Sequence, residues 1–158
     1  MSKVKLDKTD LQILKRLQEN GKITNLQLSE EIGLSPAPTL ERVRKLESAK
    51  IITGYHAVVD EQALGIGIKA FIQISLGRQA VNFISVFKEK VIAINEVVDC
   101  YVVTGTCDFI LKVEVADVTA FENLITNKLS KVEEIGNMQT LVILSQPKSS
   151  KTTPIDYE

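Results

Sequence analysis

The residues most able to do chemistry in this sequence lie in one short segment that begins at Ser35. If the segment winds as a helix at about 100° per residue, its apolar residues share an inner side and its outer side is small or basic. Such a helix fits the major groove of DNA, which is contacted mainly by residues near the start of the helix. The candidate DNA-contacting residues are Ser35, Pro36, Ala37, Pro38, Thr39, Arg42, Arg44 and Lys45.

The role expected of each residue follows from its position on that helix. Ser35 and the free N–H groups of the first turn can hold a phosphate. Arg42 can reach a base edge, whereas Arg44 and Lys45 are better placed for phosphates. Thr39 turns toward the inner side of the helix, so only its place in the first turns recommends it.

The same charges also fit an ordinary surface helix of a three-helix bundle. Lys45 lies four residues after Glu41, and Arg44 lies three residues before Glu47. Both spacings allow ion pairs along a helix. The formal net charge of the chain is -1, although up to residue 60 there are ten Lys and Arg against eight Asp and Glu. This small positive surplus favours a nucleic-acid partner without requiring one.

Other classes of chemistry have little support in these 158 residues. His56 is the single histidine, and no Cys–His pair, phosphate-binding glycine loop or metal-ligand cluster accompanies it. Cys100 and Cys107 are too few for a zinc cluster and fit reduced thiols. We therefore expect no enzyme, no metal and no cofactor. The start of the chain carries charges without an apolar run, and no stretch is long enough to span a bilayer, which predicts a cytoplasmic protein without membrane contact.

Three helices are predicted to position the basic segment. Asp7 caps the first, which ends at Gly21, and the second starts near Thr24 or Asn25 and stops at Gly33. Ser35 caps the third, which runs to about residue 49 and has proline at its first position. This part of the chain therefore predicts a helix-turn-helix bundle over residues 1–52.

Beyond residue 52 the apolar residues alternate, which indicates strands. Residues 53–67 are predicted to form a linker, with a short extended stretch at Thr53–Val59, and residues 147–158 a polar tail with little to pack. The elements expected between them are strands over 68–76, 97–104, 109–115 and 136–144, a helix over 82–91 with Phe83, Val86 and Phe87 inward, and a helix after Asp117 that buries Phe121, Leu124, Ile125 and Leu129. This β-α-β-β-α-β order predicts a ferredoxin-like domain over residues 68–146.

Motifs in both parts of the chain resemble one known family, the leucine-responsive regulators (Lrp/AsnC). Their order and spacing agree over nearly the whole chain. The matching segments are Leu6-Asp7-Lys8-Thr9-Asp10-Leu11-Gln12-Ile13-Leu14, Leu17–Lys22, Ile32-Gly33-Leu34-Ser35-Pro36, Arg42-Val43-Arg44-Lys45-Leu46-Glu47, Ile51-Ile52-Thr53-Gly54-Tyr55 and Gly105-Thr106-Cys107-Asp108-Phe109-Ile110-Leu111-Lys112-Val113.

The resemblance implies an α+β chain with an N-terminal winged helix-turn-helix and a C-terminal ferredoxin-like (RAM) domain. It implies a DNA-binding transcription regulator that forms a homodimer through its C-terminal domains, with dimers assembling into a ring that is commonly an octamer. A two-fold dimer reads pseudo-palindromic half-sites on double-stranded DNA, spaced by about one helical turn or a multiple of it. The effector of the family is typically an amino acid, held where C-terminal domains of neighbouring dimers meet.

Carried over to this sequence, the resemblance implies an effector site in a loop and on the last strand. Backbone N–H groups around the loop glycine can receive a carboxylate, and the loop aspartate can accept from an ammonium group. Thr106 stands where many members carry an acidic residue, so the ligand stays open. A glycine and an aspartate in a hairpin also serve turn geometry alone. The implied residues are Thr104, Gly105, Thr106, Cys107 and Asp108, with Gln139 and Thr140 as weaker candidates.

A second hypothesis belongs to a different class of function. A ferredoxin-like domain can regulate a partner protein, with the helical bundle used for docking in place of DNA binding. Salt-dependent retention of duplex DNA distinguishes the two hypotheses.

Overall fold

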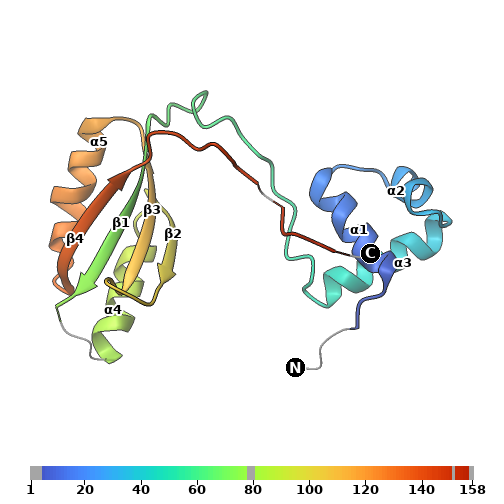
Figure 1. Cartoon of the computed structure of the whole chain (residues 1–158), viewed down its shortest axis with the longest axis horizontal. Coiled ribbons are helices and arrows are strands. Elements are labelled where there is room, and N and C mark those ends of the chain that lie inside the picture. Colours follow the sequence, from blue (N-terminus) through green and yellow to red (C-terminus); the bar gives the residue numbers. More distant parts are fainter. Residues whose placement is uncertain (1–4, 78–80, 151, 157–158) are drawn as a thin grey trace. The chain divides into compact units, whose positions relative to one another are not determined.

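The computed structural model describes residues 5–77, 81–150 and 152–156, which form two compact units (Figure 1). The first unit joins the chain up to Val58 with the C-terminal segment from Lys148. The second unit runs from Val59 to Pro147.

The first unit is a bundle of three helices around one small core. Each helix contributes one fully enclosed side chain to this core: Ile13, Leu28 and Leu46 are all at most 2% exposed. The helices are α1 (Lys8–Glu19), α2 (Asn25–Ile32) and α3 (Pro36–Ser48).

The helices start at the predicted capping residues, but α1 ends at Glu19 with Asn20 as its C-cap, before the predicted Gly21. Asp7 and Thr24 each form a capping box at the start of α1 and α2, and Gly33 ends α2 with a left-handed φ of 70°. Ser35 occupies the cap position of α3, but its side chain makes no capping hydrogen bond. Pro36 at the first helical position has no N–H, so part of the usual need for a cap is already removed.

The predicted extended stretch Thr53–Val59 is not a strand. Its residues have no regular secondary structure and are exposed. A strand needs a neighbour to satisfy its N–H and C=O groups, and the sheet described below does not include this stretch.

The second unit confirms the predicted β-α-β-β-α-β order. Its four strands form an antiparallel sheet in the order β2-β3-β1-β4, the ferredoxin-like arrangement. The elements are β1 (Ile68–Leu76), α4 (Val81–Ile92), β2 (Val97–Val102), β3 (Phe109–Val115), α5 (Val118–Asn123), a π-helical turn (Leu124–Lys128), a 3-10 turn (Leu129–Lys131) and β4 (Ile135–Val142). The second and last strands end two residues earlier than predicted.

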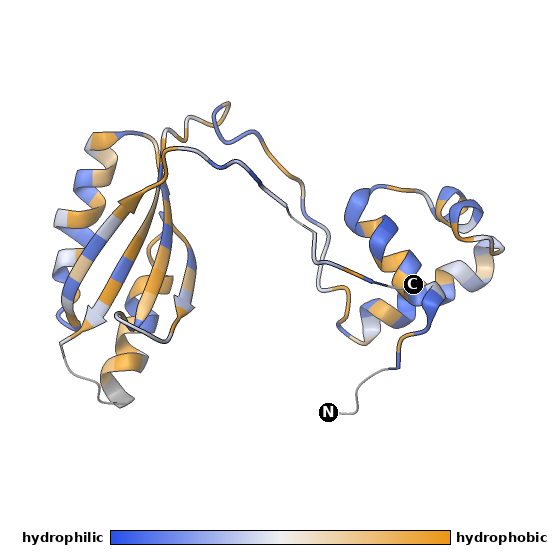
Figure 2. Cartoon of the chain, in the orientation of Figure 1, coloured by the Kyte–Doolittle hydropathy of each residue, from blue (hydrophilic) through white to orange (hydrophobic). Residues whose placement is uncertain are grey.

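Helices cover one face of this sheet, and the core lies between the helices and the sheet. On β1 the alternate residues Ala70, Ile72 and Ile74 are fully buried, which agrees with the alternation of apolar residues in the predicted strand. The rings of Phe87 and Phe109 join α4 to β3 with their centroids 4.5 Å apart. Figure 2 shows hydrophobic residues along the strands.

The predicted inner face of α4 is partly wrong. Phe87 is buried, but Val86 is 38% exposed, and Val91 and Ile84 pack on the core. Positions 84, 87 and 91 are three and four residues apart and form one helical stripe, which leaves Val86 to the side. In the second helical segment Leu124 and Leu129 are buried, as predicted, with Phe121 and Ile125 partly buried against the same core.

The C-terminal segment packs more than predicted. Thr153 pairs with Gln18 on α1, although the sequence predicted a tail with little to pack. No helix among the described residues is long and apolar enough to cross a membrane.

Candidate nucleic-acid interface and ligand loop

The start of α3 presents small residues to solvent. Ser35, Pro36, Ala37 and Pro38 are all exposed, so the backbone of the first turn is accessible. The unpaired N–H groups of a helix start and its positive dipole end attract an anion such as a phosphate. Asn25 supports this turn, because its Nδ2 donates to the carbonyl oxygen of Pro36 at 2.8 Å. Sequence patterns do not indicate this role of Asn25, because the contact joins two helices.

Arg44 and Lys45 are the exposed cations of α3. Neither makes an ion pair within the part of the chain that the structure describes, so the predicted pairs with Glu41 and Glu47 are not formed. Glu47 accepts a hydrogen bond from the Tyr55 hydroxyl at 3.0 Å. Both cations are therefore available to an external anion.

Tyr55 joins the start of the linker to α3 through its hydrogen bond to Glu47. Partial burial and the neighbouring Glu47 carboxylate raise the pKa of Tyr55 to about 12. The hydroxyl thus stays protonated and keeps donating its hydrogen bond at neutral pH.

Thr39 is fully buried, and its hydroxyl donates to the carbonyl oxygen of Ser35 at 3.0 Å. This agrees with its predicted inward direction on the helix. Among the predicted DNA-contacting residues, Thr39 is the one that the fold encloses completely.

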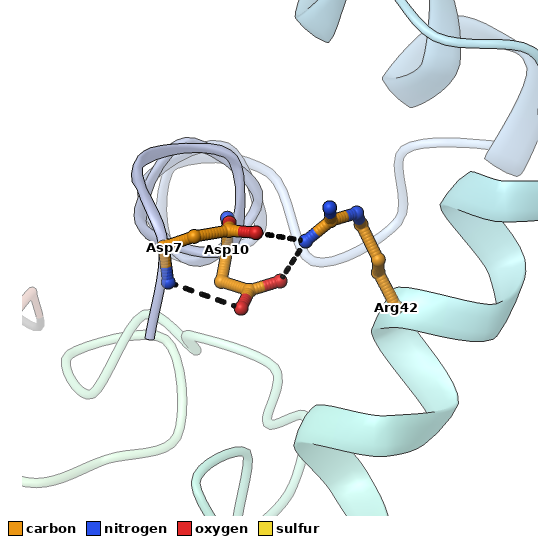
Figure 3. Close-up of polar contacts among 3 residues, drawn as sticks. All are labelled: Asp7, Asp10 and Arg42. Carbon is orange, nitrogen blue, oxygen red and sulfur yellow. Dashed lines mark hydrogen bonds and ion pairs between the residues drawn. The ribbon is translucent and has the colours of Figure 1, made fainter. Parts of the chain in front are cut away.

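Arg42 joins α3 to the start of α1 (Figure 3). Its Nη1 lies 2.7 Å from Asp7 Oδ2 and 2.7 Å from Asp10 Oδ1. The Asp10 side chain is 2% exposed and the Arg42 side chain 32%. The backbone N–H of Asp10 and the Arg42 guanidinium lower the pKa of Asp7 below its usual value. The two carboxylates thus serve both the α1 cap and the contact with α3.

The loop between β2 and β3 is fixed to the end of β1. The Asp108 backbone N–H donates to Ile74 O at 2.8 Å, and Asp108 Oδ2 accepts from the N–H of Leu76 at 2.8 Å. Val103 N donates to Asp108 O at 3.1 Å and closes the loop. Asp108 therefore shapes the loop through both its backbone and its carboxylate.

Within this loop, Gly105 has a φ of 125°, a conformation that side chains rarely adopt, and no atom crowds the position of a Cβ. Thr104 and Thr106 are exposed, and Cys107 is partly buried. The structure brings residues 104–108 together at one end of the sheet, with residues 104–106 exposed.

Gln139 and Thr140 lie on the edge strand β4, on opposite faces of the sheet. Gln139 is opposite Gln73, on the sheet face without helices, whereas Thr140 is opposite Ile72, whose side chain is in the core. Successive residues of a strand point to opposite faces. A single chain therefore does not direct both side chains to one ligand.

The sheet face without helices is apolar at its centre. A shallow hollow of about 400 Å³ lies there, lined by Phe71, Gln73, Tyr101, Val102, Val103, Ile110 and Leu141. Tyr101 and Leu141 are 49% and 44% exposed. We call this surface the open sheet face. The described residues contain no group of three His, Cys, Asp or Glu side chains able to hold a metal ion.

Comparisons with known proteins agree with both units. Residues 6–53 match the family described as winged helix-turn-helix DNA-binding, and residues 69–153 match the Lrp/AsnC ligand binding domain. The leucine-responsive regulatory proteins of Escherichia coli K12 and Klebsiella pneumoniae are each 36% identical over 145 residues, which is 92% of this chain and 88% of each relative.

Solved structures show the same likeness over the full length. A Neisseria meningitidis transcriptional regulator in complex with L-Met superposes with a TM-score of 0.91 at 35% identity, over 95% of this chain and 97% of that chain. AsnC of E. coli superposes with a TM-score of 0.87 at 30% identity, over 96% of this chain and 100% of that chain.

The fold and these matches define a DNA-binding transcription regulator with a ligand-binding domain. The chain belongs to the Lrp/AsnC family. This is the family that the sequence motifs resembled.

Proposed function

We propose that α3 enters the major groove and that its exposed start meets the DNA. Ser35, Pro36, Ala37 and Pro38 allow close approach of the backbone, and the N–H groups of the first turn hold a phosphate. Arg44 and Lys45 hold further phosphates. The observation that carries this proposal is that both cations are exposed and make no ion pair in the described part of the chain.

Arg42 and Thr39 have a different role in this proposal. The guanidinium of Arg42 is held by two carboxylates, and Thr39 is enclosed. Both residues position α3 in the bundle, so that the DNA contacts come from their neighbours.

Titration of duplex DNA from upstream of its own gene, at several salt concentrations, tests the DNA contacts. DNA affinity falls as salt rises. The slope of log affinity against log salt concentration corresponds to several phosphate contacts per dimer, and Lys45→Ala reduces the magnitude of that slope by about 1. Lys131→Ala, an exposed change in the second unit, leaves the slope unchanged. If Lys45→Ala and Lys131→Ala show the same salt dependence of DNA affinity, Lys45 makes no phosphate contact. If the protein retains no DNA even at low salt, the proposed binding in the major groove is wrong.

The effector in this proposal is an amino acid bound by residues 104–108. The N. meningitidis regulator at 35% identity is a complex with L-Met, and the loop here offers backbone groups near a glycine. Gln139 and Thr140 point to opposite faces of one chain, so they join the ligand only where subunits meet. This supports a site shared between neighbouring dimers.

A melting-temperature screen of amino acids, including methionine and leucine, tests this effector site. Binding raises the melting temperature by mass action. Gly105→Ala abolishes the ligand-induced shift, whereas Gly65→Ala, at a second glycine with positive φ and open space, preserves it. Equal ligand-induced shifts in both variants place the effector outside the loop.

The assembly in this proposal is a homodimer formed through the open sheet face, with dimers assembling to an octamer. The exposed apolar centre of this face supports a partner surface. Its proposed action on DNA supports a cytoplasmic location.

A further inference from the structure

The C-terminal segment returns to α1 and is held there by two hydrogen bonds. Gln18 Nε2 donates to Thr153 O at 3.1 Å, and Thr153 N donates to Gln18 Oε1 at 2.6 Å. One carboxamide thus satisfies both backbone groups of one tail residue, as a neighbouring strand does. The contact depends on an extended backbone more than on the tail side chains.

Charged, polar and apolar residues surround this pair. A hollow between the exposed side of α1 and the tail is lined by Lys15, Gln18, Glu19, Thr152, Thr153, Pro154 and Ile155. Ile155 is partly buried within a segment that is otherwise exposed. Pro154 restricts the backbone next to Thr153, which lowers the entropy lost on docking.

Docking gives the chain a second connection between its two units. The first connection is the linker that leaves the helical unit at Val58, and the second is the step from Pro147 to Lys148. The tail holds α1 near its end, while Arg42 holds the start of α1 to α3. A contiguous set of contacts thus runs from the tail through α1 to the proposed DNA-contacting helix.

We propose that the exposed side of α1 is a docking surface for the chain's own C-terminal segment, and that docking limits how the DNA-binding unit reorients in the dimer. Two connections leave fewer orientations than one, so the dimer accepts a narrower range of half-site spacings. The second half of this proposal rests on the proposed DNA binding by α3.

Proteolysis tests the docking itself without DNA. Trypsin cleavage after Lys148, followed by mass spectrometry on the full-length protein, becomes at least three-fold faster in Gln18→Ala and in Thr153→Pro, which lacks the donor N–H. Alanine favours helix, and circular dichroism verifies that α1 is retained. Glu30→Ala, an exposed change on α2 outside the hollow beside α1, is the matched control and cleaves at the parent rate. Equal rates in all four proteins overturn the docking.

Half-site spacing tests the coupling. Inserting about five base pairs, half a helical turn, between the half-sites of a bound duplex lowers the DNA affinity of the parent protein. The factor by which the insertion lowers DNA affinity is at least three-fold smaller in Gln18→Ala and in a chain ending at Pro147. In Glu30→Ala this factor is the same as in the parent. The same loss in all proteins overturns the coupling. A parent that binds no duplex contradicts the proposed function and the coupling with it, while the cleavage rates still decide the docking.

Discussion

Asp10 is a buried charged residue of the DNA-binding unit, and its carboxylate needs partners within the bundle. Its carboxylate is buried at 1% exposure, yet it accepts from the Asp7 N–H at 3.3 Å and from Arg42 at 2.7 Å. A buried charge is tolerated when such partners satisfy it, and removal of one partner exposes the full cost of burial. Arg42 therefore stabilises the bundle chiefly by keeping Asp10 paired.

Arg42→Met is expected to destabilise the protein by about 3 kcal/mol, because it leaves the Asp10 carboxylate buried without its cation. Arg44→Met, on the exposed side of the same helix, is expected to change stability by less than about 0.5 kcal/mol. Urea unfolding followed by circular dichroism measures both. Adding Asp10→Asn to Arg42→Met restores part of the loss, since no buried unpaired charge then remains. Similar small effects of both arginine changes contradict this role.

The caps at Asp7 and Thr24 were predictable because a capping box is local and its residues are three positions apart. The partner of Arg42 was not, because Asp10 lies 32 residues away and on another helix. Helical winding shows which way a side chain points, but it does not show what another helix places there.

At the scale of elements, the start of α3 combines two properties that a variant can separate. The positive end of the helix dipole favours a negative side chain in the first turn. The same position faces the DNA in our proposal, where a negative side chain meets phosphates. Ala37 is exposed there, so a longer side chain fits without repacking.

Ala37→Glu is therefore expected to move stability and DNA affinity in opposite directions. The dipole interaction raises stability by about 0.3–1 kcal/mol, while repulsion from phosphates lowers DNA affinity at least ten-fold at low salt. Ala37→Gln, of the same size but uncharged, separates charge from bulk. Thermal unfolding and a DNA titration measure the two effects. Undiminished DNA affinity in Ala37→Glu places the interface elsewhere.

Helices and strands were predicted well where the apolar pattern repeated over many residues and where capping or turn residues stood at both ends. The stretch Thr53–Val59 was overpredicted as extended structure, because alternation alone does not supply the neighbouring strand that a strand needs. The direction of Val86 was wrong because residues 83, 86 and 87 also fit a helical stripe, and helical winding alone does not show which of two overlapping stripes the sheet covers.

At the scale of the whole molecule, the open sheet face is an apolar surface that no helix in the described part of the chain covers. Helices cover the other face, and the open face exposes Tyr101 and Leu141 around an apolar hollow. The sequence predicted the sheet and its buried face from alternation. It did not show which outward residues gather, because that depends on the register between strands.

Leu141→Lys is expected to break the proposed dimer while leaving each subunit folded. The side chain is 44% exposed in the single chain, so lysine is tolerated there, but burying its charge against a second copy is strongly unfavourable. We expect the dimer dissociation constant to rise at least 100-fold, measured by sedimentation at low micromolar concentration. DNA affinity falls with it, because a monomer engages one half-site at a time. Ile92→Lys, at a 73% exposed position of α4, is the matched control and leaves the dimer intact. A Leu141→Lys protein that sediments as the parent does shows that the dimer uses another surface.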